Sequence, residues 1–342
     1  MKHGFVKVKA FSPEARVADV KFNTAKIIQA VWDCAEHGVK VLVLPELCIC
    51  GASCGDLFKQ KALICACESA IEDIRASSYG KELTVFVGAP LYNGARLYDC
   101  AVAISNGKIL GVVPNTSANS RHFETDYDTD EIVIGTQSYP FGCELVFECE
   151  SMSELKIGVA FGADLFSPIG TDSALCLSGA TLIACLNASH QIVGAEEKLC
   201  LMAKSRSLAN KCAYAIASAG EGETTTDVLY ASHNIICENG EILAQSAPFS
   251  SKTGDTVSEI DVSYLTYRRA VDASFKQGAT SASTVKFNLK VEKTALTRKI
   301  DALPFISDDA SRYEKILTIQ SRALAKRLVA SHSKSAVIGI SG

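Results

Sequence analysis

Apolar residues along the first ninety positions alternate between strand-like and helix-like patterns. Residues 5–11 alternate apolar and polar side chains, as a strand with one buried face does, and residues 40–46 form a continuous apolar run, as a strand buried on both faces does. Between them, residues 20–37 repeat apolar side chains every three to four positions, which predicts a helix. The same patterns predict a helix over 57–78 and a strand over 83–90.

Two hairpins divide the rest of the pattern. Asn106-Gly107 and Asn239-Gly240 each lie between two alternating runs, and Asn-Gly between such runs favours a tight hairpin turn. The strand–helix rhythm returns between the hairpins, with strands predicted at 155–161, 181–187 and 213–218 and helices near 171–178 and 195–211. Two similar halves of this kind predict an α/β fold, in which two packed sheets carry helices on their outer faces as an α-β-β-α sandwich.

The pattern becomes polar and weakly periodic after about residue 275. We therefore predict a sandwich domain over 1–275, a linker with a bridging helix over 276–335, and the first strand and truncated loop of another domain over 336–342. The bridging helix has candidate caps at Ser307, Asp308 and Asp309, and an apolar face with Ile316, Ile319 and Leu324. The apolar segment Val337–Ile340 is predicted as the strand, and Ser341 and Gly342 follow it.

Composition narrows the function classes. The chain has 342 residues, of which 48% are hydrophobic and 21% charged, with a net charge of −4 and a pI near 5.9. This balance is ordinary for a globular protein, and no basic patch with interleaved aromatic residues indicates nucleic acid. The longest apolar runs are too short to cross a bilayer and the N-terminus has no apolar signal segment. We therefore predict a cytoplasmic protein without nucleic-acid or membrane partners.

Fourteen cysteines raise the question of a metal site. The densest group has C-x-C and C-x3-C spacing and no nearby histidine, whereas structural zinc sites use paired C-x2-C spacings with further ligands at matching distances. Free cysteines also pack well as small apolar residues in a core. We favour the core interpretation over the metal interpretation, and therefore predict no metal, for Cys48, Cys50, Cys54, Cys65 and Cys67.

Three long segments resemble one protein family. The stretch "FSPEARVADVKFN" together with "LVLPELCICGASCGDLF" resembles the beginning of the glutamine-dependent NAD synthetases. The stretch "SAGEGETTTDVLYASHNIICENGEILAQS" resembles their second hairpin region, and "PFISDDASRYEKILTIQSRALAKRLVASHSKSAVIGISG" resembles the bridge into their synthetase domain. The resemblance covers nearly the whole chain.

The resemblance implies a nitrilase-type glutaminase domain, a carbon–nitrogen hydrolase that serves NAD biosynthesis. In that family a Glu-Lys-Cys set hydrolyses glutamine and the ammonia passes to a synthetase domain, whose S-G-G-x-D-S loop holds ATP phosphates. Ser341 and Gly342 match the first two residues of that loop. The resemblance thus implies no cofactor in this chain, because ATP and Mg²⁺ would belong to the synthetase domain. It also implies a homo-oligomer and, as a further partner, a separate synthetase domain.

Residues at the expected active site depart from the family pattern. Glu46 in "LPELC" matches the general base, but Asn115 stands at the lysine position and Gly162 at the position of the nucleophilic cysteine. Ala52 replaces a tyrosine, and Ser189 matches a substrate-contacting serine. The surrounding motifs also differ, since the family's E-I-C-E-D-L and S-A-S-N appear here with substitutions at Ala160, Ala163, Asn187 and His190.

These departures predict a retained fold with a degenerate site. Glycine has no nucleophilic atom, and asparagine brings no positive charge to stabilise an oxyanion. We expect burial to raise the pKa of Glu46, with Asn115 able to donate to its carboxylate. Cys176 and Cys185 lie in the same half of the fold, but not at the strand end where a nucleophile must point.

Three functions remain open from the sequence. The chain could be the glutaminase portion of an NAD synthetase that serves as an assembly scaffold for an ammonia-using synthetase partner. It could be a stand-alone pseudoenzyme that binds a small amide or nothing. It could also be an active hydrolase of unusual chemistry, which neither a metal constellation nor a second nucleophile supports.

Overall fold

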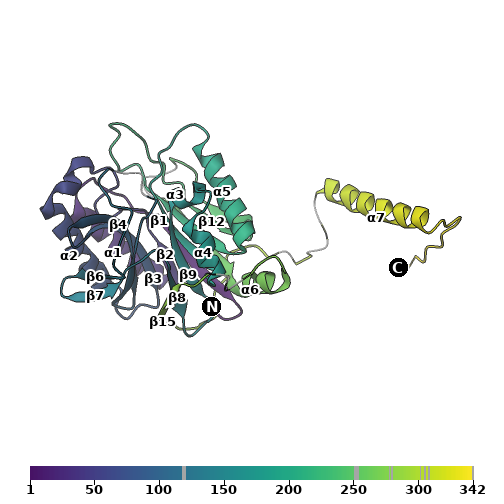
Figure 1. The fold of residues 1–342 in the computed structure, drawn as a ribbon, viewed down its shortest axis with the longest axis horizontal. Coiled ribbons are helices and arrows are strands. Elements are labelled where there is room, and N and C mark those ends of the chain that lie inside the picture. The colour runs from purple at the N-terminus through teal and green to yellow at the C-terminus, as the bar shows by residue number, and fades with distance from the viewer. Residues whose placement is uncertain are drawn as a thin grey trace. The chain divides into compact units, whose positions relative to one another are not determined.

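The structure is a computed structural model that describes residues 1–117, 121–249, 254–276, 278, 280–300, 302–303, 306 and 309–340. The chain divides into two units, residues 1–298 and residues 299–342. The first unit carries both large sheets, and the second carries one long helix (Figure 1). Each unit is described by itself below.

The first sheet has six strands. Its order is β14-β1-β2-β3-β4-β5. Strands β1, β2 and β3 run parallel, whereas β14 pairs antiparallel with β1, β4 with β3, and β5 with β4. Strands β1 to β5 correspond to those predicted from the sequence, including the hairpin at Asn106-Gly107, where both residues have positive φ. The predicted strand 40–46 is shorter in the structure, and β14 was not predicted. Their bounds are β1 Phe5–Ser12, β2 Val41–Val43, β3 Thr84–Asn93, β4 Arg96–Ser105, β5 Lys108–Pro114 and β14 Gly254–Asp261.

The second sheet has seven strands in the order β13-β12-β11-β10-β9-β8-β15. Strands β9, β10 and β11 run parallel, as the predicted strand–helix rhythm requires, and β11-β12-β13 continue antiparallel. A separate hairpin pairs β6 (Glu131–Ile134) with β7 (Gln137–Pro140). The bounds in the large sheet are β8 Leu145–Cys149, β9 Lys156–Phe161, β10 Leu182–Asn187, β11 Ala213–Ser218, β12 Ile235–Glu238, β13 Glu241–Gln245 and β15 Ser283–Phe287.

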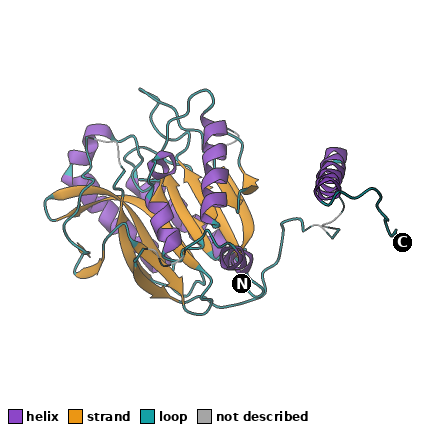
Figure 2. Cartoon of the chain, turned by 45° about the vertical axis from the view of Figure 1, so that its right-hand side comes forward, coloured by secondary structure: helices purple, strands orange, loops and turns teal. Residues whose placement is uncertain are grey.

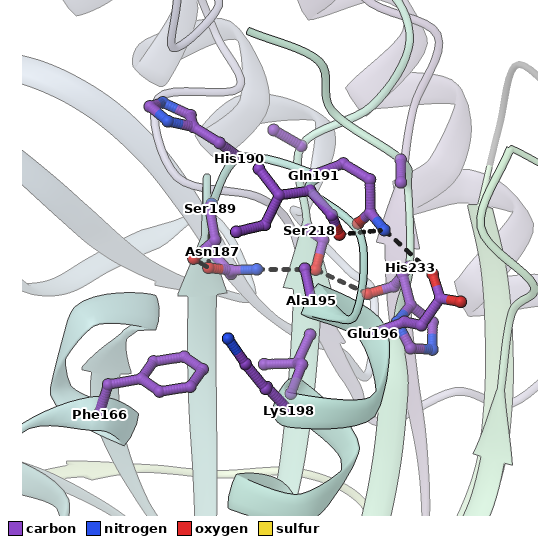
Figure 3. A pocket seen from close by; sticks show the side chains of 14 residues that line it. Phe166, Asn187, Ser189, His190, Gln191, Ala195, Glu196, Lys198, Ser218 and His233 are labelled. Atoms are coloured by element: carbon purple, nitrogen blue, oxygen red, sulfur yellow. Dashed lines mark hydrogen bonds between the residues drawn. The ribbon is translucent and has the colours of Figure 1, made fainter.

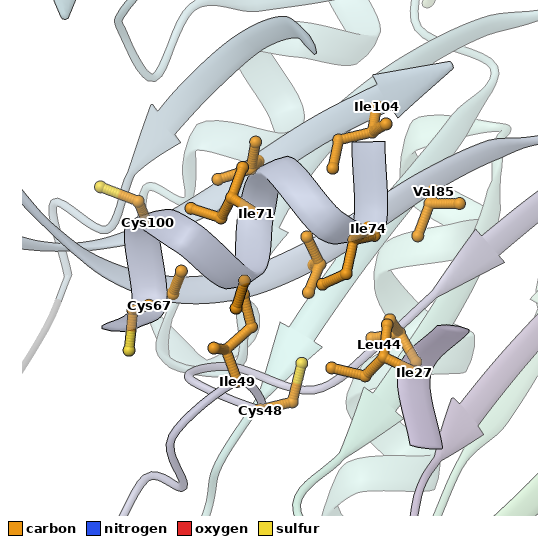
Figure 4. Packing of buried hydrophobic residues seen from close by; sticks show 14 of the residues in the cluster. Ile27, Leu44, Cys48, Ile49, Cys67, Ile71, Ile74, Val85, Cys100 and Ile104 are labelled. Atoms are coloured by element: carbon orange, nitrogen blue, oxygen red, sulfur yellow. The ribbon is translucent and has the colours of Figure 1, made fainter. Parts of the chain in front are cut away.

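Helices cover the outer face of each sheet (Figure 2). On the first sheet lie α1 (Val20–Glu36) and α2 (Lys61–Ser77), and α2 buries Cys67, Ile71 and Ile74 against the strands (Figure 4). On the second lie α3 (Gly162–Phe166), α4 (Thr171–Leu177) and α5 (Ala195–Asn210); α6 (Val262–Val271) follows β14. The predicted helix 57–78 begins only at Lys61, because Gly55–Lys59 form a separate 3₁₀ turn.

A third apolar cluster lies between the two sheets. It joins Val8 and Phe86 of the first sheet to Phe147, Val159 and Ala184 of the second, and the rings of Phe86 and Phe147 meet edge to face at 5.6 Å. Both sheets are therefore buried on two faces, which explains the continuous apolar runs in their parallel strands. The α-β-β-α sandwich predicted from the sequence is confirmed.

The predicted linker is wrong over residues 283–287. These residues form β15, which pairs in parallel with β8 from Ser283 opposite Leu145 to Phe287 opposite Cys149. This segment has little periodicity because β15 is an edge strand, of which only Phe287 is buried. The first unit consequently extends to Arg298, beyond the boundary at 275 that the sequence predicted.

The second unit contains the predicted bridging helix, α7 (Ala310–Ala330). Asp309 caps it by accepting a hydrogen bond from the Ser311 amide at 2.9 Å; the other two predicted caps lie outside the described residues. The strand predicted at Val337–Ile340 is absent from this part of the described chain, since its apolar side chains are exposed and no described strand pairs with it. Ser341 and Gly342 lie outside the described residues.

Two searches of the described residues gave negative findings. No described helix is both long and apolar enough to cross a membrane. Within the same residues, no group of three or more histidine, cysteine, aspartate or glutamate side chains has an arrangement that could hold a metal ion.

Candidate functional site

A cavity of about 600 Å³ opens where strands of both sheets end. Four of the residues singled out from the sequence line it: Glu46 after β2, Ala52, Asn115 after β5 and Ser189 after β10. Ala163, the neighbour of Gly162 at the end of β9, lines it as well. The fold therefore brings together the positions that the sequence assigned to one site.

A glycine in the neighbouring strand allows Glu46 to reach the cavity. The chain leaves β2 through Pro45 and turns at Leu47, which has a φ of +53°. A Cβ at Gly88 on β3 would lie 2.3 Å from the Leu47 nitrogen and 2.4 Å from the Pro45 oxygen, so only glycine permits this approach. The Ile49 amide then donates to the Gly88 carbonyl at 3.3 Å and ties the loop to β3.

Asp99 on β4 is a site residue that sequence reasoning missed. Its carboxyl group lies beside that of Glu46, and only 1% of the residue is exposed. Burial and then the neighbouring Asp99 carboxylate raise the pKa of Glu46 well above its ordinary value, in the direction that the sequence predicted. Burial raises the pKa of Asp99 to about 6. The signal was a lone carboxylate inside the apolar run "LYDCAVAI", where an unpaired charge is costly.

Asn115 contacts Asp99, and our expectation that it would donate to Glu46 is corrected. Its Nδ2 donates to Asp99 Oδ2 at 2.9 Å, and its Oδ1 accepts from the Ser117 amide at 3.1 Å. The backbone explains this choice, because the Asn115 amide also donates to the Asp99 carbonyl at 2.8 Å and sets the two side chains next to each other. The neutral amide thus supports a carboxylate without bringing a positive charge.

The space in front of Gly162 is filled by Asn187. A Cβ on Gly162 would lie 1.9 Å from Asn187 Oδ1 and 2.8 Å from its Cγ. The Asn187 side chain, at the end of β10, is held there on both sides (Figure 3). Its Oδ1 accepts from the Ser189 amide at 3.1 Å and from the Ser189 hydroxyl at 2.5 Å, while its Nδ2 donates to Ser218 Oγ at 3.0 Å. No side chain larger than hydrogen fits at position 162 without moving this amide.

Ser189 lines the cavity, but its hydroxyl proton is directed to Asn187. Gly162 begins α3, where Asp164 Oδ2 accepts from the Phe161 amide at 2.8 Å and Oδ1 accepts from Ser117 Oγ at 2.5 Å. The Ser117 amide in turn donates to Asn115 Oδ1, so hydrogen bonds connect Asn115 to Asp164 in the helix that Gly162 begins. The site is an ordered network around Glu46 and Asp99.

Glu223 is the second site residue that the sequence did not indicate. Its buried carboxylate accepts from the amides of Ala52 at 2.7 Å and Ser53 at 3.0 Å, and from the Ser53 hydroxyl. It thereby holds the loop that follows Gly51, a glycine with a φ of +95°. The contact spans 171 positions, so no local pattern could have shown it.

The thiols lie away from this cavity. Cys176 and Cys185 are buried in the cluster under α4 and α5, and burial raises the pKa of Cys185 well above its ordinary value. No cysteine occurs among the described residues that line the cavity. The core interpretation is confirmed for four cysteines of the dense group, which are buried beside α2: Cys48, Cys50, Cys54 and Cys67. It is wrong for Cys65, which is exposed.

Comparison with known proteins gives consistent results. The family model for "Carbon-nitrogen hydrolase" matches residues 9–269. The glutamine-dependent NAD(+) synthetase of Mycobacterium leprae is 32% identical over 360 residues, which covers 99% of this chain and 53% of that protein. Its Mycobacterium tuberculosis counterpart is 31% identical, covering 100% and 53%. The chain spans about half the length of these relatives.

Solved structures show the same fold. The glutamine-dependent NAD(+) synthetase from Cytophaga hutchinsonii superposes with a TM-score of 0.64 at 22% identity, covering 75% of this chain and 43% of that chain. A Saccharomyces cerevisiae member of branch 10 of the nitrilase superfamily gives 0.61 at 15% identity, covering 79% and 96%. At these identities the likeness establishes the nitrilase-like architecture.

Proposed function

The chain belongs to the carbon-nitrogen hydrolase family, and on that premise we propose that it is a glutaminase-like domain of the NAD synthetase type that does not hydrolyse glutamine. One observation carries the proposal: the Asn187 amide occupies the space in front of Gly162, where an attacking sulfur would have to stand. Amide hydrolysis by this route requires a nucleophile there that forms an acyl intermediate. Hydrogen-bonded asparagine cannot take that role.

The charge of the cavity supports the same proposal. Attack on an amide places negative charge on its oxygen, and a positive group or aimed donors must stabilise it. No lysine or arginine occurs among the described residues that line the cavity, whereas Glu46 and Asp99 place two carboxyl groups there. A developing oxyanion beside this pair would be repelled, so Glu46 as a retained base has neither a nucleophile nor a counter-charge to work with.

A glutaminase assay tests the proposal directly. The purified chain would be incubated with glutamine and the ammonia released would be measured with a coupled enzyme. The Mycobacterium tuberculosis glutamine-dependent NAD(+) synthetase, a relative covered for 53% of its length, serves as the positive control. Loss of a nucleophile costs about 10⁶-fold in turnover in a protease, so we expect no release above the rate without protein. Ammonia release at a rate near that of the control would refute the proposal.

A role as an assembly scaffold is a second candidate. It is favoured by α7, where large apolar side chains are not covered by other described residues of the second unit: Ile316, Leu317, Ile319 and Leu324. An amphipathic helix with an uncovered apolar face needs a partner surface. Under this proposal a cytoplasmic homo-oligomer recruits a synthetase domain, which would carry ATP, Mg²⁺ and the NAD-forming step.

Sedimentation of the chain with a separately expressed synthetase domain tests the scaffold. Formation of a complex that Leu317→Glu weakens would support it. Sedimentation of the two proteins as independent species would refute it.

A further inference from the structure

We propose that the cavity at Glu46 and Asp99 binds the ammonium group of a small primary alkylamine. The proposal deepens the proposed function, since it rests on the same site lacking both a nucleophile and a lysine. The resemblance places a lysine at the position of Asn115, and Asn115 leaves the two carboxyl groups without a cationic neighbour. An amine from solution would supply the charge that the chain itself lacks.

The charge balance of the cavity selects a cation. Glu46 follows β2, Asp99 lies within β4, and Asp227 is an exposed lining residue. Neither lysine nor arginine is present among the lining residues in the described part of the chain. Opposite charge stabilises an ionised carboxylate, and a cavity that excludes bulk water strengthens that attraction.

A buried carboxylate oxygen that depends on a shared proton marks where the ammonium group would bind. Asp99 Oδ2 receives the Asn115 amide proton, whereas no described N–H or hydroxyl donor reaches the buried Asp99 Oδ1. The neighbouring Glu46 carboxyl group hydrogen-bonds the Asp99 side chain, so the pair relies on the proton that it shares. An ammonium group has three N–H donors and no acceptor. It can therefore donate to Asp99 Oδ1 and to the adjacent Glu46 carboxylate, with a third donor left for a neighbouring oxygen.

The remaining wall of the cavity fits an alkyl chain. Phe58, Phe123 and Tyr230 line it, and the rings of Phe58 and Phe123 meet edge to face at 4.8 Å. Aromatic faces attract cations and also bury methylene groups. The geometry thus points to a short primary amine with an apolar tail, and n-butylamine is a suitable probe.

Binding of the amine should release a proton. Without a cation, the two adjacent carboxyl groups retain a shared proton to a higher pH than isolated carboxyl groups do, because two like charges at close range repel each other. The bound ammonium ion keeps its own protons and favours ionisation of both carboxyl groups, so the shared proton passes to buffer. Among the described residues, the other titratable groups near the pair are these: Asp164 on α3, Cys185 on β10, Cys100 on β4, and the lining residues His122, His190, Asp227 and Tyr230.

Calorimetric titration of the full 342-residue chain with n-butylamine tests the proposal, with n-butanol as the neutral probe of the same length. We expect saturable binding of the amine, no binding of the alcohol, and proton release measured from buffers of different ionisation enthalpy. Asp99→Asn removes one charge at nearly constant shape. It should weaken amine binding by roughly tenfold or more, the scale of one charge-assisted hydrogen bond.

Two further variants keep the result interpretable. Asp73→Asn removes an exposed carboxylate of α2 outside the cavity and should bind n-butylamine as the unmodified chain does. Glu46→Gln replaces Asp99→Asn if the latter does not fold, as judged by circular dichroism. Equal binding of amine and alcohol, absence of amine binding, or unchanged affinity in the cavity variant would each overturn the proposal. None of these outcomes affects the expected absence of ammonia release from glutamine.

Discussion

The contact between Gly162 and Asn187 gives the sharpest quantitative prediction. Gly162→Ala adds a single methyl group, whose carbon would lie 1.9 Å from Asn187 Oδ1, far inside van der Waals contact. The backbone does not oppose the change, because Gly162 does not have a positive φ and lies at the start of α3, where alanine is a good helix residue. Any destabilisation must therefore come from the displacement of Asn187.

The size of the effect follows from what Asn187 must give up. Overpacking a filled site costs about 1–3 kcal/mol. Turning the amide away also breaks hydrogen bonds to Ser189 and Ser218, each worth about 0.5–1.5 kcal/mol. Since some of these bonds can re-form with water, we expect Gly162→Ala to lower the free energy of unfolding by roughly 2–4 kcal/mol.

A double-mutant cycle isolates the cause. Asn187→Ser removes Oδ1, the atom 1.9 Å from the new methyl carbon, but keeps Cβ at 3.2 Å, so Gly162→Ala in that background should cost no more than about 1 kcal/mol. The coupling energy is then at least about 1 kcal/mol. Gly142→Ala is a matched control, because this buried glycine would place its Cβ 3.5 Å from the nearest atom, Tyr127 Oη, at ordinary contact distance.

Urea unfolding followed by circular dichroism measures all these free energies. Equal stability of Gly162→Ala and the unmodified chain would refute the steric argument. So would an equal cost of Gly162→Ala with and without Asn187→Ser, since the penalty would then have another source.

Three other changes have defined outcomes. Because the pKa of Asp99 is raised to about 6 in the fold, the native state binds more protons than the unfolded chain between about pH 4 and 6. The free energy of unfolding should therefore fall by roughly 2–3 kcal/mol as pH rises through that window. Asp99→Asn should flatten this pH dependence, measured by urea unfolding. Glu223→Ala leaves two loop amides without their acceptor and should cost about 2–4 kcal/mol in the same assay. Gly162→Cys with Asn115→Lys should give at most weak glutaminase activity, and its new thiol should react with iodoacetamide faster once Asn187→Ser is added.

Local patterns were sufficient for many strands and helices of the sandwich, although not for β8, β14 or α6. The parallel strands carry continuous apolar runs, and the Asn-Gly turns have the positive φ that their sequence indicates, so these elements could be predicted residue by residue. β15 could not, because an edge strand with one buried residue has hardly any apolar pattern. Its position depends on pairing with β8, which is 138 residues away between Ser283 and Leu145.

The site was predictable by position and much less so by contact. The resemblance placed Glu46, Asn115 and Ser189 in one cavity, where the fold brings them. Asp99 was missed, because it carries no motif and matters only through its neighbours in space. Asn187 was noted as a departure from the family pattern, but its meaning depends on a distance to Gly162 that no sequence contains.

These contacts together explain why the site is more than an active site with parts removed. Asn115 takes up a hydrogen bond with Asp99, and Asn187 fills the space in front of Gly162 while it binds Ser189 and Ser218. Each of these residues makes hydrogen bonds or contacts with a neighbouring residue. Changing one of them back to the residue of the family pattern would therefore leave a clash or an unpaired polar group. We therefore propose that a stable arrangement blocks the chemistry, and we expect its recovery to require several positions to change together.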